Sequence, residues 1–447
     1  SGTPGVVTFS GRNGTSDDAT QKDWNNFGPR VGFAWQPHEN WVIRGGGGIL
    51  YLGQFTNNVT FDPALGFSKL ASFTSPDSRS AAFLLRSGFP AVSVPTEAEL
   101  TPGFGAVPVG QAATTAVSFI EPGRRNGYLE SFSLNVQRRL SANWVVEAGY
   151  LANLGHKLPG ANSENINQVP PQLMGAGNAQ IRRPFPQFNN VAVLAPAIGN
   201  SNYHGFNLRV EKRFASGFNL EANYTFSRLI DDISSRVELG GVGGSGFFNY
   251  YSRRDDRGLS GNSIAHRFVV STVYQLPFGK GKAFDPASTV VRTIVGGWSL
   301  GYIGELRSGA PYGVVEASNR SNSFSDINRP NVVGDPNING SRSRAQQVAQ
   351  WFNTAAFAAP ADYTFGNAGK TVAIGPGAIA MDMSLIRDFH IKELHQIEFR
   401  GEALNFINNP NFANPNTSRG NAAFGRITSL APGNQSRIIQ LGIRYSF

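Results

Sequence analysis

The chain has 447 residues, including 52 glycines, 26 prolines and 33 phenylalanines, and only 15% of its residues are charged. No apolar run reaches the roughly 18 residues that a spanning helix needs, and the absence of cysteine excludes disulfides, thiolate metal sites and cysteine nucleophiles. The net charge of +9 comes from scattered lysines and arginines without a basic block, so we expect no nucleic-acid partner.

Alternating apolar and polar residues predict three hairpins in the first half of the chain. The paired segments are 30–36 with 41–51, 130–140 with 144–150, and 206–211 with 218–227. Strict alternation places every apolar side chain on one face of a strand. The glycine run at 45–48 would weaken an ordinary strand, and it indicates either close backbone approach in a curved wall or a bulge.

The second half continues the same pattern. Strands are predicted at 266–278, 298–307, 383–389, 397–403 and 438–447, and one short helix at 343–351 inside a long connection. In the last strand, Ile439, Leu441 and Ile443 alternate with Gln440 and Gly442. Residues 6–9 are interpreted as the remnant of a strand that pairs with the first hairpin.

The connections between these strands alternate between short and long. Long connections occupy 53–126, 153–201, 309–379 and 408–436. A further long connection follows the third hairpin and ends near residue 265. A soluble sandwich shows no such two-sided bias, whereas outer-membrane barrels combine short periplasmic turns with long extracellular loops. We therefore predict an all-β fold over residues 1–447, an antiparallel up-and-down transmembrane β-barrel of about eleven or twelve strands. The terminal strand then descends, and Phe447 lies at the periplasmic rim.

Two sets of side chains follow from this prediction. Aromatic residues near strand ends are expected to form membrane girdles, and charged residues on the opposite strand faces are expected to line a wet lumen with cross-strand ion pairs. The girdle set is Trp41, Tyr51, Trp144, Tyr150, Trp298, Tyr445 and Phe447. The lumen set is Arg209, Glu211, Glu221, Glu305, Arg307, Glu398, Arg400 and Glu402.

Several short motifs resemble the C-terminal part of TonB-dependent receptors of the Oar-like group. They are NFGPRVGFAW at 26–35, WVIRGGGGILY at 41–51, SLNVQRR at 133–139, NYHGFN at 202–207, HRFVV at 266–270, LPFGKGK at 276–282 and the terminal strand. The resemblance implies a plugged barrel of about 22 strands that imports a scarce or bulky nutrient with energy from TonB. It also implies an N-terminal carboxypeptidase-regulatory-like domain in full-length members. We expect the plug and that domain to be absent here. TonB would therefore act only through a plug domain that this chain does not contain.

The resemblance further implies that outer-membrane lipid and the barrel-assembly machinery are partners, the latter through the aromatic C-terminal strand. The chain is expected to lie in the bacterial outer membrane and to be a transport protein, not an enzyme. An alternative is a structural or adhesive protein whose open strand edges self-associate into a fibre or sheet. A secreted carbohydrate-binding sandwich is a third interpretation.

Motifs for catalysis, cofactors and metals are not found in the sequence. The glycine-rich segment 241–246 follows no buried strand and opens no helix, so it is interpreted as a loop and not a phosphate site. His390 and His395 flank a turn and are either metal ligands or, as we prefer, solvated turn residues. Asp231, Asp232, Asp255 and Asp256 lie on one long loop and are candidates for binding a cation or substrate, or are solvated charges without a ligand.

Overall fold

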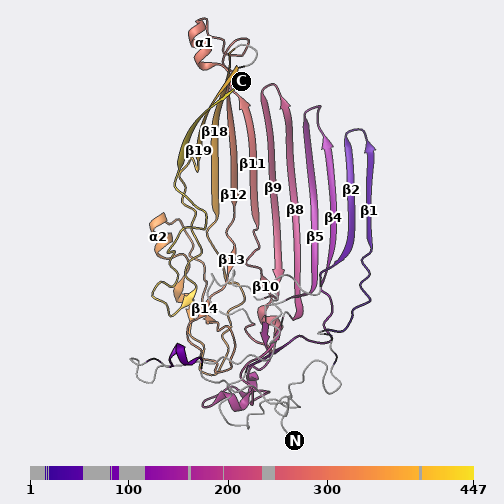
Figure 1. The fold of residues 1–447 in the computed structure, drawn as a ribbon, viewed down its shortest axis with the longest axis vertical. Helices are drawn as coiled ribbons and strands as arrows, with labels where there is room; N and C mark the ends of the chain where they lie inside the picture. Colours follow the sequence, from indigo (N-terminus) through magenta and orange to yellow (C-terminus); the bar gives the residue numbers. More distant parts are fainter. Residues whose placement is uncertain are drawn as a thin grey trace.

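The computed structural model describes residues 16, 18, 20–53, 81, 83–89, 116–159, 163–194, 196–233, 247–391 and 395–447. One antiparallel sheet of twelve strands dominates this part of the chain (Figure 1). The strand expected at 6–9 and the glycine-rich segment 241–246 lie outside the described residues.

The long strands pair in chain order, each with its predecessor and successor. They are β1 Arg30–His38, β2 Trp41–Tyr51, β4 Tyr128–Arg139, β5 Trp144–Pro159, β8 Ala197–Ala215, β9 Phe218–Asp231, β11 His266–Gln275, β12 Trp298–Arg307, β18 Ala378–Ile391, β19 His395–Leu404 and β21 Ile438–Ser446. The twelfth strand, β10 (Gly258–Leu259), pairs with the end of β9. The predicted all-β, up-and-down order is confirmed, and β1 and β21 form the two edges of the described sheet.

Short connections lie at one end of the sheet, and long connections lie at the other end. Short turns, such as residues 39–40 and 216–217, lie at the upper end in Figure 1, and the long connections lie at the lower end. The alternation predicted from the sequence is therefore confirmed. We call the two ends of the sheet the short-turn end and the long-loop end.

Helix α1 (Thr289–Val295) lies at the short-turn end and was not predicted, because its β-branched sequence TVVRTIV is typical of a strand. Its last carbonyl groups find donors on the sheet. Arg387 donates to the carbonyls of Thr293 and, at 2.5 Å, Ile294, and Trp298 Nε1 donates to the Ile294 carbonyl at 2.9 Å. These bonds satisfy carbonyls that a helix end leaves without partners, and they give Arg387 hydrogen-bond partners on the aromatic face of the sheet.

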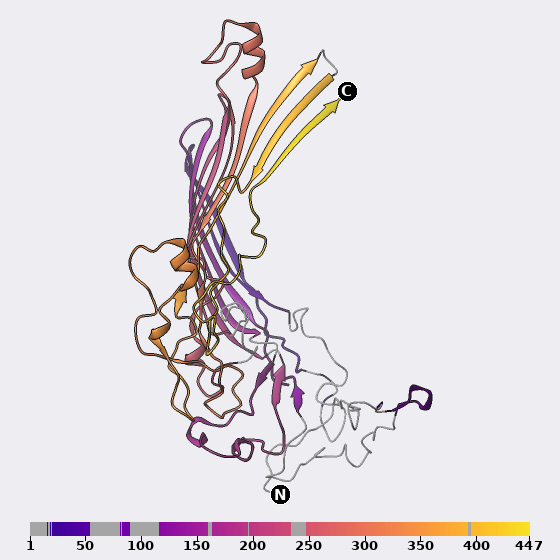
Figure 2. The same ribbon diagram turned by 90° about the vertical axis from the view of Figure 1, so that its left-hand side faces the viewer.

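The strand register places the alternating apolar side chains on one common face. Ile443 lies opposite Phe399 and Leu300 opposite Tyr274, and the polar residues between them point to the other face. The strand register is continuous through Gly45–Gly48, so the glycine run is not a bulge, and a side chain at Gly45 would meet the Phe33 ring at 2.5 Å. Figure 2 shows that the sheet curves and that β18, β19 and β21 turn toward its concave side.

Several strands are longer than predicted, and three of them extend furthest into the long connections. β5 continues to Pro159, β8 begins at Ala197 and β18 begins at Ala378, so residues assigned to long connections belong to the sheet. These extensions lie at the long-loop end, where the sequence no longer alternates regularly. Tyr150, predicted at a strand end, therefore lies in the middle of β5.

The described parts of the long connections (116–127, 163–194, 247–265, 308–377 and 405–437) fold together, and we call them the loop layer. It contains small strands and helices: β3 Val117–Phe119, β6 Ser163–Asn165, β7 Val191–Leu194, β13 Pro311–Tyr312, β14 Val315–Glu316, β15 Asn331–Val332, β16 Phe357–Ala358, β17 Ala373–Ile374, β20 Ser418–Arg419, α2 Arg344–Ala349, η2 Pro171–Leu173, η3 Ala179–Arg182, η4 Arg253–Asp256 and η5 Thr354–Ala356. Helix α2 confirms the helix predicted at 343–351.

The loop layer holds the buried core of the described residues. One apolar cluster consists of Tyr312, Val314, Phe352, Ala356 and Phe357, and the largest fully buried side chains all belong to the loop layer. The sheet, in contrast, is a single layer whose apolar face stays open. Large side chains there, such as Leu441 (72% exposed) and Ile443 (76% exposed), are not covered by a second layer of the described residues. Such a face requires an apolar environment.

Candidate functional site

The polar face of the sheet carries all eight residues predicted to line a lumen. The strand register connects β8, β9, β11, β12, β18 and β19 and places these residues on the same face: Arg209, Glu211, Glu221, Glu305, Arg307, Glu398, Arg400 and Glu402. The aromatic residues lie on the opposite face. The two faces of this sheet therefore differ in chemistry along most of its width.

Ion pairs stabilise the charges on this polar face. Glu211 and Glu221 lie directly across from each other, and Arg209 Nη2 contacts a carboxylate oxygen of each at 3.1 Å. The arginine thereby offsets the repulsion that two facing carboxylates produce. This confirms a cross-strand ion pair, between Arg209 and Glu221.

A second cross-strand pair involves Arg267, which the sequence analysis missed. Arg267 Nε donates to Glu305 Oε1 at 2.9 Å, between β11 and β12. Arg267 follows His266 at the start of β11, and only the register reveals its neighbour. Arg400, in contrast, lies 3.4 Å from both Glu398 and Glu402 on its own strand.

A cavity of about 380 Å³, with apolar, charged and amide groups in its lining, opens where this face meets the last long connection. Its lining includes Glu305, Arg307, Asp382, Asn411 and Asn434. Asp382 accepts a hydrogen bond from the backbone of Asn405 at 2.7 Å, which fixes the connection on the sheet. The cavity offers charges of both signs and amide groups to a small polar molecule.

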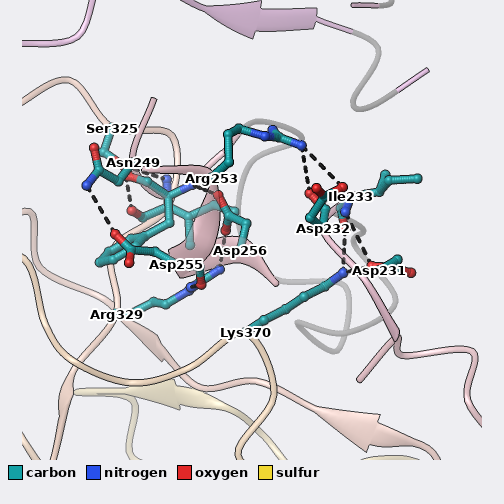
Figure 3. Close-up of polar contacts among 12 residues, drawn as sticks. Asp231, Asp232, Ile233, Asn249, Arg253, Asp255, Asp256, Ser325, Arg329 and Lys370 are labelled. Carbon is teal, nitrogen blue, oxygen red and sulfur yellow. Dashed lines mark hydrogen bonds and ion pairs between the residues drawn. The ribbon is translucent and has the colours of Figure 1, made fainter. Parts of the chain in front are cut away.

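The four aspartates predicted as loop ligands form internal contacts instead. Figure 3 shows Lys370 reaching Asp231 and Arg253 reaching Asp232, the latter at 3.4 Å. Asp232 also accepts hydrogen bonds from the backbone and side chain of Asn200, at 2.6 and 3.0 Å. The expectation of a solvated acidic cluster is wrong for these residues, because both aspartates are buried.

The Asp256–Arg329 pair is the most enclosed ion pair of the loop layer. Their side chains are 1% and 3% exposed and approach to 2.6 Å. Asp256 also accepts from the Phe248 backbone at 3.2 Å, and Arg329 lies over the Phe248 ring at 4.6 Å. Burial raises the pKa of Asp256, and the charge of Arg329 opposes that rise. Asp255 accepts from Asn249 at 3.1 Å (Figure 3).

Glu164 on β6 is a buried titratable group that no sequence pattern indicated. Glu164 is only 2% exposed. Burial raises the pKa of Glu164 to about 7, against the lowering effect of Arg253. Nearby, the Asn167 side chain donates to three backbone carbonyls, those of Phe185, Phe188 and Asn189. These contacts organise the segment 163–194, which has no regular periodicity.

The structure places most of the predicted girdle residues at strand ends. Trp41, Trp144 and Trp298 begin their strands at the short-turn end, and Tyr445 and Phe447 lie at the same end of β21. Tyr51 ends β2 at the long-loop end. Tyr150 is the exception noted above. Its hydroxyl lies 2.7 Å from His204 Nδ1, a pairing repeated by Tyr224 with His266 and by Tyr445 with His395.

No group of three or more potential metal ligands occurs among the described residues. His395 contacts Tyr445, and the side chain of His390 lies outside the described part of the structure. Within the same residues, no helix is long and apolar enough to cross a membrane.

Comparison with known proteins identifies one family. The family described as outer membrane beta barrel domain matches residues 1–440. No curated protein sequence matches the chain. Together with the antiparallel sheet, the family match confirms the predicted β-barrel fold class.

The chain is similar to many solved structures, of which three transporters and receptors are examples. The FrpB iron transporter of Neisseria meningitidis shows 11% identity and a TM-score of 0.41, over 94% of this chain and 39% of that chain. The transporter YddB of Escherichia coli shows 9% identity and a TM-score of 0.40, over 91% and 38%. The ferripyoverdine receptor of Pseudomonas aeruginosa shows 10% identity and a TM-score of 0.41, over 94% and 33%. The chain thus spans well under half of these proteins.

Proposed function

Because the chain belongs to the family of outer membrane β-barrel domains, we propose that it forms part of the barrel wall of a TonB-dependent receptor. The chain is located in the bacterial outer membrane. In the proposed protein, this wall surrounds a path for a scarce or bulky nutrient. The motifs at 26–35, 41–51 and 276–282 support the Oar-like group as the subtype.

The observation that carries this proposal is that one face of the sheet is mainly apolar and the other carries the charged side chains. The apolar face, with residues such as Leu300 and Ile443, suits lipid, and the face with Arg209, Glu221 and Arg400 suits water. A polar face of this kind can contact a plug domain or a passing solute. The cavity beside Glu305 and Arg307 is a candidate contact point for either.

The orientation follows from the sorting of the connections. Long loops are extracellular in outer-membrane barrels, so the loop layer faces the outside and the short turns face the periplasm. The girdle residues Trp41, Trp144 and Trp298 then lie at the periplasmic interface. Partners of the whole receptor are TonB, reached through a plug, and the barrel-assembly machinery, reached through β21.

An uptake experiment tests this function. In the producing bacterium, deletion of the gene should abolish energy-dependent accumulation of at least one compound from a panel of radiolabelled ferric chelates, cobalamin and oligosaccharides. A strain without TonB should show the same loss, and the intact gene should restore uptake. Unchanged uptake across the panel, combined with loss of cell–cell adhesion in the deletion strain, would instead favour the structural or adhesive alternative.

A further inference from the structure

A cavity of about 510 Å³ lies on the apolar side of the sheet, where the sheet meets the loop layer. The sheet contributes Tyr224, His266, Phe268, Leu306 and Ile379, and the loop layer contributes residues around α2 and the segment 409–412. Figure 2 shows α2 beside the convex side of the sheet, away from the direction in which β21 turns. The cavity therefore opens on the outside of the curved wall.

The lining divides into an apolar floor and a cationic rim. Phe268 and Leu306 lie opposite each other in the register, and each side chain is 37% exposed. The rim carries Arg344 from the loop layer and His266 from the sheet, and no aspartate or glutamate belongs to the lining. Arg307 lines the cavity at the end of β12, but the register places its side chain on the polar face of the sheet. The rim charge is therefore not balanced within the cavity.

Arg344 is the rim residue best placed to meet an anion. It is exposed, and its contact in the described structure is with a neutral amide, the Asn409 oxygen at 3.3 Å. It makes no ion pair with any described residue. A guanidinium group presents several donors to phosphate oxygens.

The rim is also held in place by the local structure. Ser343 and Gln346 form a capping box at the start of α2, which fixes the backbone beside Arg344. Trp351 Nε1 donates to the Ile374 carbonyl at 2.9 Å, anchoring the far end of this segment. His266 Nδ1 lies 2.7 Å from the Tyr224 hydroxyl, so the imidazole ring is oriented by a neighbour on the sheet.

We propose that this cavity binds an anionic, phosphate-bearing membrane lipid, with its acyl chain on Phe268 and Leu306 and its phosphate at Arg344, beside His266. Two observations select this occupant. The floor is continuous with the apolar face of the sheet, and Arg344 adds a positive charge to the rim without an acidic residue in the lining. A soluble anion would use the rim and leave the floor exposed.

Lipid retention by the purified full chain tests this proposal. The protein is equilibrated in detergent with lipid A, phosphatidylglycerol or zwitterionic phosphatidylcholine, and retained lipid is counted by native mass spectrometry. We expect retention of lipid A or phosphatidylglycerol over phosphatidylcholine, and the preferred lipid of the two identifies the leaflet. Arg344→Glu should reduce this retention about tenfold, equivalent to the loss of roughly one charge-assisted contact. Arg344→Lys should retain most of it.

The matched control is Arg426→Glu, which changes an exposed arginine of the loop layer outside this cavity. It should retain lipid like the unchanged protein. Heat-modified mobility in electrophoresis reports whether each variant is folded. Equal retention by the folded Arg344→Glu and Arg426→Glu proteins would overturn the proposal, as would equal retention of phosphatidylcholine. Displacement of the lipid by millimolar inorganic phosphate would reassign the cavity to a soluble anion.

Discussion

Arginine at Val270 is expected to destabilise the membrane-inserted protein by about 2–4 kcal/mol, whereas arginine at Ser271, on the polar face, is expected to change its stability much less. Val270 lies in the middle of β11 on the apolar face, between Ala222 and Gly304 of the neighbouring strands. Ser271 is its neighbour in the chain and points to the polar face, between Glu221 and Ile303. The two variants introduce the same residue at neighbouring positions of one strand, on opposite faces of the sheet.

The measurement is the folding equilibrium of Val270→Arg and Ser271→Arg in phospholipid vesicles, followed by tryptophan fluorescence during a urea titration. A guanidinium group at Ser271 lies across the strands from the Glu221 carboxylate, and this opposite charge stabilises the introduced arginine. At Val270 the same group is placed in hydrocarbon. Equal losses of stability in the two variants would contradict the assignment of the two faces.

Arg329→Ala is expected to destabilise the loop layer by about 3–5 kcal/mol, because it leaves the Asp256 carboxylate buried without its cation. The two side chains are almost completely enclosed and 2.6 Å apart. The matched control is Arg320→Ala, which removes an exposed ion pair with Asp362, where the side chains are 42% and 65% exposed. Exposed pairs of this kind contribute about 0–1 kcal/mol.

The loss of loop-layer stability in Arg329→Ala should depend on pH. Burial raises the pKa of Asp256 and Arg329 opposes this, so removal of Arg329 raises that pKa further. A carboxyl group with a raised pKa in the folded state favours folding below its unfolded pKa, and this contribution disappears as the pH rises through the folded value. Limited proteolysis of membrane-inserted protein should therefore cleave the loop layer of Arg329→Ala more slowly at acidic than at neutral pH. Cleavage of Arg329→Ala and Arg320→Ala at equal rates would show that the buried pair does not stabilise this layer.

The large sheet could be predicted because a membrane imposes a strict pattern on each strand. The segment 41–51 was expected as one strand, and β2 has those bounds. The pattern weakens where strands leave the bilayer, since neither face must then be apolar. For that reason β5 was predicted to end near residue 150, although it continues to Pro159.

The loop layer could not be predicted, because its stabilising contacts join residues that are distant in the chain and lie in no periodic element. Asp231 pairs with Lys370 and Asp256 with Arg329, and neither lysine nor arginine carries a local signal of its partner. The small strands here are as short as two residues, as in β13 and β17. The acidic residues could be assigned to a loop, but only the folded structure reveals the cationic partners of Asp231, Asp232 and Asp256.

Oxygen accessibility along β12 tests the central claim most directly, that one face of this sheet contacts lipid and the other contacts water. The chain has no cysteine, so single cysteines at 299–306 can be spin-labelled without background. In vesicles, labels at Leu300, Tyr302 and Leu306 should collide mainly with dissolved oxygen, and labels at Ser299, Ile303 and Glu305 mainly with a water-soluble nickel chelate. The predicted result is that the ratio of these two collision rates alternates from one residue to the next. A ratio that does not alternate along β12 would contradict the account.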